Sequence, residues 1–254
     1  MNDFYSDTKT KPSKEMLEYA LGRTFGDEQK DEDPTTLELC ERVARLLGKE
    51  SAVFLPSGTM CNEIAITVQT SPGDEILCDR TCHIINFEGG APAAMSGVMI
   101  HPLDGKRGQF TEEDVSQALR PKSRHMPISR MLCAEQTVNL GGGGVWPVEK
   151  LDSVAQVAKK SGLSTHLDGA RLLNACAKTG ISAARYSHEY DSCWIDFTKG
   201  LGAPVGAVLA GSTDFIEAAW RVKQRIGGAM RQSGVIASFC LYALEKNVER
   251  LADD

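Results

Sequence analysis

Acidic and basic side chains stand where two short apolar stretches end. Asp168 follows "STHL", Arg171 comes three positions later, and Lys199 lies just after "SCWIDF". Both stretches have the length and composition of buried β-strands. A lysine at such a position costs free energy to desolvate unless it is paired with an acid or used covalently. We therefore treat these three residues as candidates for chemistry.

A third stretch, "SAVFL", is followed by Ser57, Gly58 and Thr59 at the start of a predicted helix. The N–H groups and the dipole of a helix N-terminus bind phosphate. Pyridoxal phosphate uses such a start together with a lysine that forms a Schiff base and a carboxylate that keeps the pyridine nitrogen protonated. The three strand ends therefore predict a site for this cofactor, in which Arg171 faces the ring oxygen or a substrate carboxylate.

Each of these positions also has an ordinary structural interpretation. Ser57 or Thr59 can be a simple helix N-cap. Asp168 and Arg171 can form a buried ion pair while Lys199 extends to the surface. We favour the cofactor site because all three strand ends carry suitable groups.

The composition favours a small-molecule partner. The chain has 254 residues, of which 42% are hydrophobic and 24% charged, and its net charge is -6. Its lysines and arginines are scattered, which argues against a nucleic-acid groove or an anionic membrane surface. No apolar run reaches the roughly 18 residues of a membrane span, and the first residues lack an apolar signal core. We expect a cytoplasmic protein.

The eight cysteines are spread along the chain, so we expect reduced thiols rather than a disulfide framework. The tightest group is "CDRTCH", which contains Cys78, Cys82 and His83. These three ligands have no second cluster to complete a tetrahedral zinc site. We therefore predict no metal.

Strand-like and helix-like segments alternate along the chain. Seven segments that are short, apolar or β-branched predict strands at residues 51–55, 75–79, 97–100, 129–135, 164–168, 192–197 and 205–211. Start signals and helical spacing predict helices at residues 33–50, 111–120 and 147–162. This alternation predicts an α/β fold with a mainly parallel sheet covered on both faces. Ligands bind such sheets beyond the carboxyl ends of the strands.

Several longer motifs resemble the threonine aldolases of the β-eliminating lyase group of pyridoxal-phosphate enzymes. The similar stretches are "YSDTKTKPS", "SAVFLPSGTMCNE", "HIINFEGGAP", "HLDGARLLNA", "TKGLGAPVGAVLAG" and "GGAMRQSGV". The resemblance implies the large domain of the aspartate-aminotransferase fold, with a seven-stranded type of sheet. It also implies a homo-oligomer, a dimer or tetramer with shared active sites. The implied reaction is retro-aldol cleavage of a β-hydroxy-α-amino acid of the threonine, allo-threonine or phenylserine type to glycine and an aldehyde.

The resemblance implies catalytic and cofactor-binding roles for individual residues. Lys199 matches the Schiff-base lysine, and Asp168 matches the partner of the pyridine nitrogen. His83 matches the histidine stacked on the cofactor ring and is a candidate base. Gly58 and Thr59 match the phosphate loop.

Three further matches concern substrate and subunit contacts. Arg171 matches an arginine beside the cofactor oxygen and the substrate carboxylate, and Ser6 matches a second carboxylate contact. Arg231 matches an arginine that reaches the cofactor phosphate of a neighbouring subunit.

The chain departs from the family pattern at two places. Many relatives have Tyr-Gly-x-Asp-Pro where this chain has "KDEDP", so that Lys30 and Asp31 replace the aromatic residue and the glycine. If the glycine position has a positive φ, Asp31 adds strain. Many relatives have Glu-Asn-Thr-His-Asn where this chain has "EQTVN", so Val138 replaces a histidine proposed to contact the substrate hydroxyl. An apolar side chain there favours a more hydrophobic β-substituent.

We expect three parts: an N-terminal arm over residues 1–25, a cofactor-binding large domain over 26–228, and a helix over 229–254. That helix carries an apolar stripe, which we expect to be exposed because the C-terminal small domain of the relatives is missing after it. Three functions remain open. They are a threonine-aldolase-like lyase, a β-eliminating lyase of the same group, and a truncated, non-catalytic cofactor-binding remnant.

Overall fold

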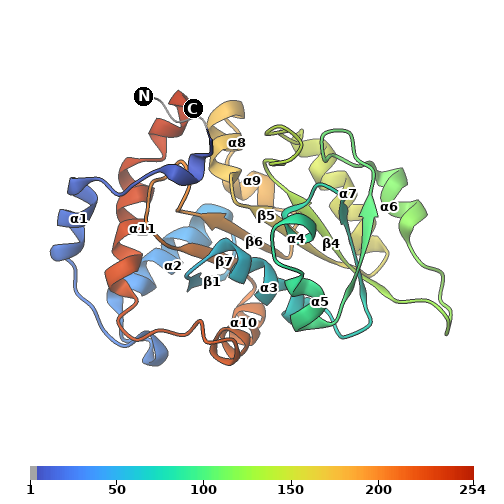
Figure 1. Cartoon of the computed structure of the whole chain (residues 1–254), viewed down its shortest axis with the longest axis horizontal. Coiled ribbons are helices and arrows are strands. Elements are labelled where there is room, and N and C mark those ends of the chain that lie inside the picture. Colours follow the sequence, from blue (N-terminus) through green and yellow to red (C-terminus); the bar gives the residue numbers. More distant parts are fainter. Residues whose placement is uncertain (1–4) are drawn as a thin grey trace.

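A seven-stranded sheet forms the centre of the computed structural model, which describes residues 5–254 (Figure 1). The strands are β1 (Ser51–Leu55), β2 (Glu75–Asp79), β3 (Met99–Leu103), β4 (Ser129–Glu135), β5 (Ser164–Gly169), β6 (Ser192–Asp196) and β7 (Ala207–Gly211). Their order in the sheet is β1-β7-β6-β5-β4-β2-β3. All neighbours are parallel except β7, which is antiparallel to both β1 and β6. The predicted α/β fold class is confirmed.

Helices cover both faces of the sheet. One face carries α3 (Gly58–Gln69) and α10 (Thr213–Arg225), with α5 (Ala91–Ser96) beside α3. The other carries α2 (Pro34–Leu47), α6 (Glu112–Ala118), α7 (Val148–Lys160) and α9 (Ala183–Ser187). The remaining elements are α1 (Lys14–Leu21), α4 (His83–Asn86), α8 (Leu172–Thr179), α11 (Gly234–Lys246) and the short 3-10 helices η1 (Asp7–Lys9), η2 (Glu28–Lys30) and η3 (Glu249–Asp253).

Burial on both faces explains why strands such as β1 and β7 carry apolar residues at successive positions. In β1, Phe54 belongs to the main core, together with residues of α2 and α7. Its neighbours Val53 and Leu55 pack instead with α3 and α10, because successive side chains of a strand point to opposite faces. A sheet covered on both faces needs apolar residues at both sets of positions.

Local signals set the bounds of the predicted helices. Asp33 caps α2 by accepting a hydrogen bond from the Thr36 backbone N–H at 2.9 Å, Pro34 is the first helical residue, and Gly48 ends the helix with a φ of 62°. Within residues 5–254, no helix is long and apolar enough to span a membrane.

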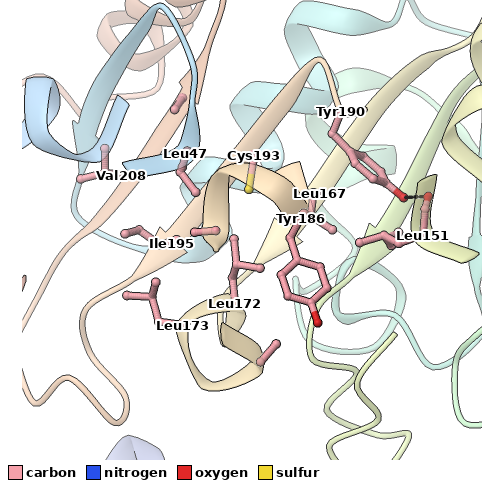
Figure 2. Close-up of a cluster of buried hydrophobic side chains, with 14 of the residues drawn as sticks. Leu47, Leu151, Leu167, Leu172, Leu173, Tyr186, Tyr190, Cys193, Ile195 and Val208 are labelled. Atoms are coloured by element: carbon pink, nitrogen blue, oxygen red, sulfur yellow. Dashed lines mark hydrogen bonds between the residues drawn. The ribbon is translucent and has the colours of Figure 1, made fainter. Parts of the chain in front are cut away.

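The main core supports the strand that ends at the candidate site. Figure 2 shows Leu167 of β5 among side chains from α7, α8, α9 and β6. The Tyr190 hydroxyl, which lies in the same core, donates a hydrogen bond to the Leu151 carbonyl oxygen at 3.1 Å. These contacts hold the end of β5 firmly against α7.

The expected single helix over residues 229–254 is wrong. The structure has α11 over Gly234–Lys246, followed by the separate helix η3. The apolar stripe is not exposed as a whole, because α11 packs against α1 and α2. Leu251 is buried, and five further stripe residues are partly buried against the main core: Ile236, Phe239, Tyr242, Leu244 and Val248. Val235 remains 44% exposed. Helical spacing alone could not show that the N-terminal arm covers this face.

The backbone at Asp31, where many relatives have glycine, has the positive φ that the sequence analysis considered. Asp31 has a φ of 56° and a ψ of 31°, which is the left-handed region that favours glycine. A non-glycine residue there costs about 1 kcal/mol or more. The neighbouring Lys30 ends η2.

Leu167→Ala should destabilise the folded chain by about 2 to 5 kcal/mol, because it leaves a cavity in a core that cannot collapse around it. Urea unfolding measures the change. Leu140→Ala is the matched control, since Leu140 is 50% exposed and the same truncation there should change stability by no more than about 0.5 kcal/mol. Equal effects at the two positions would contradict the placement of Leu167 in the core.

Candidate active site

The candidate residues meet at one edge of the sheet. Strands β1, β2, β4, β5 and β6 all end at this edge, since β1 is parallel to β6 through the antiparallel β7. A cavity of about 130 Å³ opens there. Its lining residues are Ser57, Gly58, Thr59, His83, Glu135, Asp168, Ala170, Arg171, Trp194, Asp196 and Lys199. Seven of the residues singled out in the sequence therefore lie together, while Ser6 and Arg231 do not line the cavity.

The first turn of α3 forms one wall of the cavity. Ser57 is the N-cap and accepts a hydrogen bond from the Met60 backbone N–H at 3.3 Å, so the N-cap interpretation is correct as well. Gly58 packs directly on Trp194 of β6, and a Cβ at this position would lie 2.2 Å from the Trp194 ring. Only glycine lets the helix begin so close to the end of the sheet.

Asp168 is a buried carboxylate at the end of β5. It is 1% exposed, and its two oxygens accept hydrogen bonds from the Ala170 backbone N–H at 3.1 Å and the Asn62 side-chain amide at 3.0 Å. Burial, and then the charge of Cys82, raise the pKa of the carboxyl to about 6. Among residues 5–254, no cation forms an ion pair with Asp168. A protonated pyridine nitrogen would fill that role.

Asn62 of α3 connects the polar side chains of the site through hydrogen bonds. It is not among the residues singled out from the sequence. Its amide nitrogen donates to Asp168 and, at 2.9 Å, to Glu88. Its amide oxygen accepts from Trp194 Nε1 at 2.7 Å and from His166 Nε2 at 3.1 Å. Both hydrogens and both lone pairs of the amide are used, which fixes its orientation. The available signal was the polar pair Asn62 and Glu63 in the otherwise apolar segment "CNEIAI".

His83 begins α4 and is oriented by Glu88. The His83 Nδ1 atom lies 2.6 Å from the Glu88 carboxylate, and the His83 backbone N–H donates to Glu135 at 3.0 Å. Burial lowers the pKa of the imidazole, but the hydrogen bond to Glu88 and the charge of Asp168 outweigh burial and raise it. His83, Glu88, Asn62 and Asp168 thus form one connected network.

The two basic side chains at the cavity have their own acidic partners. Lys199 is 15% exposed and its Nζ contacts the Asp196 carboxylate. Arg171 forms two hydrogen bonds with Asp7, from Nε at 2.6 Å and from Nη2 at 2.8 Å. The alternative of an Asp168–Arg171 ion pair with Lys199 at the surface is therefore wrong.

The two predicted site residues that do not line the cavity, Ser6 and Arg231, each form polar contacts with nearby side chains. Ser6 caps η1 by accepting from the Thr8 backbone N–H at 3.2 Å, and its hydroxyl donates to Asp7 at 3.4 Å. Arg231 is 62% exposed and pairs with Asp27 at 2.8 Å. Ser6 therefore stands next to the partner of Arg171, whereas Arg231 lies elsewhere on the surface.

Val138 does not line the cavity. It is buried in the main core, and a Cβ added at Gly108 would lie 2.2 Å from its Cγ1 atom. Its apolar side chain therefore fills the space beside Gly108.

Two acids of the cavity were missed although the sequence carried a signal for them. Glu135 ends β4 and Asp196 ends β6, while Asp168 is the last residue but one of β5 between them, so three adjacent parallel strands each carry an acid at this edge. Burial, and then the charge of Asp168, raise the pKa of Glu135 to about 9. Its carboxyl oxygens accept from the backbone N–H groups of His83 and Asn139.

Comparison with known proteins agrees with this geometry. A profile of the beta-eliminating lyase family matches residues 3–254. The chain belongs to this family. Beta-eliminating lyases and threonine aldolases depend on pyridoxal phosphate, so the expected family and cofactor are both confirmed.

Relatives and solved structures extend the match. Over 258 residues the chain is 39% identical to a probable low-specificity L-threonine aldolase 2 of Arabidopsis thaliana, covering 99% of this chain and 72% of that protein. It is 40% identical to an uncharacterized protein of Caenorhabditis elegans, covering 96% of this chain but only 59% of that protein. A putative L-allo-threonine aldolase from Listeria monocytogenes superposes with a TM-score of 0.81 at 26% identity, covering 95% of this chain and 67% of that one.

The residues of this lyase chain fit the cofactor. The buried Asp168 lacks a cationic partner among the described residues, as a pyridine-nitrogen partner would. Lys199 places an amine in the same cavity, and the first turn of α3 lines it with Gly58 and Thr59. This donor set suits a phosphorylated pyridine aldehyde.

Another buried acid, Glu63 of α3, lies close enough to Glu88 for their charges to interact. Within the described chain, neither of its carboxyl oxygens has a hydrogen-bond partner, and both are shielded from water. Burial, and then the charge of Glu88, raise the pKa of Glu63 from its ordinary value of 4.5 to about 8. Glu63 therefore favours the neutral form in the folded chain.

Glu63→Gln should prevent the loss of folding stability that the original chain suffers as the pH rises from about 4.5 to about 8. Because the pKa of Glu63 is higher in the folded chain than in the unfolded chain, its contribution is present below about pH 4.5 and is lost as the pH rises to about 8. The advantage of the variant should grow over this window to roughly 1 kcal/mol or more and then level off. Urea midpoints between pH 5 and 9 measure it, with the exposed Glu217→Gln as control. Parallel stability curves for the Glu63 variant and the original chain would refute the assignment.

Proposed function

We propose that this chain forms the cofactor-binding large domain of a lyase that cleaves a β-hydroxy-α-amino acid to glycine and an aldehyde. The observation that carries the proposal is the meeting of Lys199 and the cation-free carboxylate of Asp168 in one cavity, within a family whose relatives include threonine aldolases. The substrate is of the threonine, allo-threonine or phenylserine type.

Three parts of the site bind the cofactor. When bound, pyridoxal phosphate supplies an electron sink for the carbon-carbon bond that breaks. Asp168 keeps a negative charge at the ring nitrogen and so holds a proton on it. Lys199 would hold the cofactor covalently through its amine, which lies in the same cavity. The first turn of α3, at Ser57, Gly58 and Thr59, offers backbone N–H groups to the phosphate.

The remaining site residues act on the substrate. His83, which lines the cavity, would lie against the cofactor ring and would take the proton from the β-hydroxyl, directly or through a water molecule. Glu88 supports this role because it orients the imidazole and stabilises the charge that the imidazole gains when it takes the proton. Arg171 and Ser6 bind the substrate carboxylate. The Lys199 amine would also return a proton to the substrate Cα once the aldehyde has left.

We also propose that the protein acts in the cytoplasm as a homo-oligomer. Arg231 then reaches the cofactor phosphate of a neighbouring subunit, a role that its exposed side chain permits. Residues 1–25 serve as an arm, residues 26–228 hold the cofactor, and residues 229–254 lead out of that domain.

Loading the chain with pyridoxal phosphate and reducing it with borohydride should leave a pyridoxyl group on Lys199, found by peptide mapping. The loaded chain should release glycine and an aldehyde from a β-hydroxy-α-amino acid. Lys199→Arg should abolish both the label and the release. A label on Lys178 or on the buried Lys223 would contradict the role of Lys199, and ammonia with a keto acid in place of glycine would favour the β-eliminating alternative.

Asp168→Asn should keep the cofactor but lower turnover about a hundredfold or more. Removing one partner of a buried charge pair costs roughly 3 kcal/mol or more, and each 1.36 kcal/mol is tenfold in rate. Initial rates of glycine release measure the loss, with bound cofactor quantified separately by absorbance. Asp214→Asn, at an exposed position of α10, is the matched control. Turnover within about threefold of the original would rule out a role for the Asp168 charge.

A further inference from the structure

The N-terminal arm is tied to both basic residues of the candidate site. Asp7 of η1 forms its two hydrogen bonds with Arg171, and the Thr10 hydroxyl donates to the Lys199 carbonyl oxygen at 2.8 Å. Figure 1 shows this blue segment running from α1 towards α8, far in the sequence from the strands that end at the cavity. The arm therefore contacts residues of the site directly, as the strand ends do.

Asp7 occupies only one edge of the Arg171 guanidinium. A guanidinium has five N–H hydrogens, and Asp7 takes the one on Nε and one of the two on Nη2. Among residues 5–254, no group forms a hydrogen bond with Nη1. The Nη1–Nη2 edge thus keeps the two parallel donors that bind a carboxylate in a bidentate manner.

Another carboxylate competes for the same guanidinium. Asp168 lines the cavity with Arg171, and its charge raises the pKa of Arg171. The Arg171 side chain is 15% exposed, so without Asp7 it would be a largely buried cation in need of a partner. Pairing with Asp168 would cancel the charge that the ring nitrogen needs. Asp7, which lies on the arm, removes that alternative because it already binds the guanidinium.

We propose that Asp7 is a positioning residue, which holds Arg171 by its Nε–Nη2 edge and presents the Nη1–Nη2 edge to the carboxylate of the amino-acid substrate. This inference rests on the proposed function. It assigns the arm a part in substrate recognition: Asp7 sets where the carboxylate binds without touching the substrate itself.

The test compares Asp7→Asn with Asp7→Glu and with Glu18→Gln, an exposed control on α1. Binding is measured by titrating the absorbance of the cofactor-loaded full chain with glycine, and with ethanolamine, an amine without a carboxylate. Asp7→Asn should weaken glycine binding and raise KM about tenfold or more, as expected for a charged hydrogen bond, while kcat stays within about threefold. Ethanolamine binding should not change, and Asp7→Glu should recover part of the glycine affinity.

A readout without cofactor follows the arm itself. In the unloaded chain, Asp7→Asn should speed hydrogen exchange in the peptide that covers residues 5–13, whereas Glu18→Gln should not. This separates a loosened arm from a fault in catalysis.

Several outcomes would overturn the inference. Tighter glycine binding in Asp7→Asn would mean that Asp7 competes with the substrate carboxylate, and equal losses for glycine and ethanolamine would mean that the arm only covers the cavity. Unchanged glycine binding would overturn the inference alone. If the loaded original chain binds no glycine, the proposed function fails and the inference fails with it.

Discussion

A buried carboxylate without a cation beside it is the constraint on which the site depends. Asp168 sits near the end of β5, where burial makes its ionised form costly, and the hydrogen bonds from Asn62 and Ala170 together with the charge of His83 offset part of that cost. Asn62 can turn its amide hydrogens to the carboxylate because Trp194 and His166 occupy its oxygen. The strand order and the start of α3 thus combine to keep one negative charge available at the cavity.

The cations around the cavity are arranged so that none of them neutralises Asp168. Each pairs with a different acid. The pairs are His83 with Glu88, Arg171 with Asp7, and Lys199 with Asp196. Since a buried ion pair gains little over its desolvation cost, these pairs are better understood as devices of orientation than of stability. They leave each basic group close to the site without an ion pair to Asp168 among the described residues.

Much of the fold could be predicted because its signals are local. The seven strands are short apolar runs between turn residues, and the capping residues Asp33, Pro34 and Gly48 mark both ends of α2. The segment after Ala229 shows what such local signals fail to predict. Its spacing predicted one long helix with an exposed face, yet the helix ends at Lys246 and α1 covers it. Which surfaces meet is not encoded in the periodicity of either helix.

The sequence by itself determined the family, the fold class and the residues at the strand ends, Asp168 and Lys199 among them. Parallel strands deliver such residues to one edge whatever the details of packing. Only the tertiary structure decided the partners of these residues. Asn62 meets Asp168 across 106 positions, and Asp7 meets Arg171 across 164. Contacts over such separations depend on how helices and arm pack on the sheet, and neither residue type nor local spacing specifies that packing.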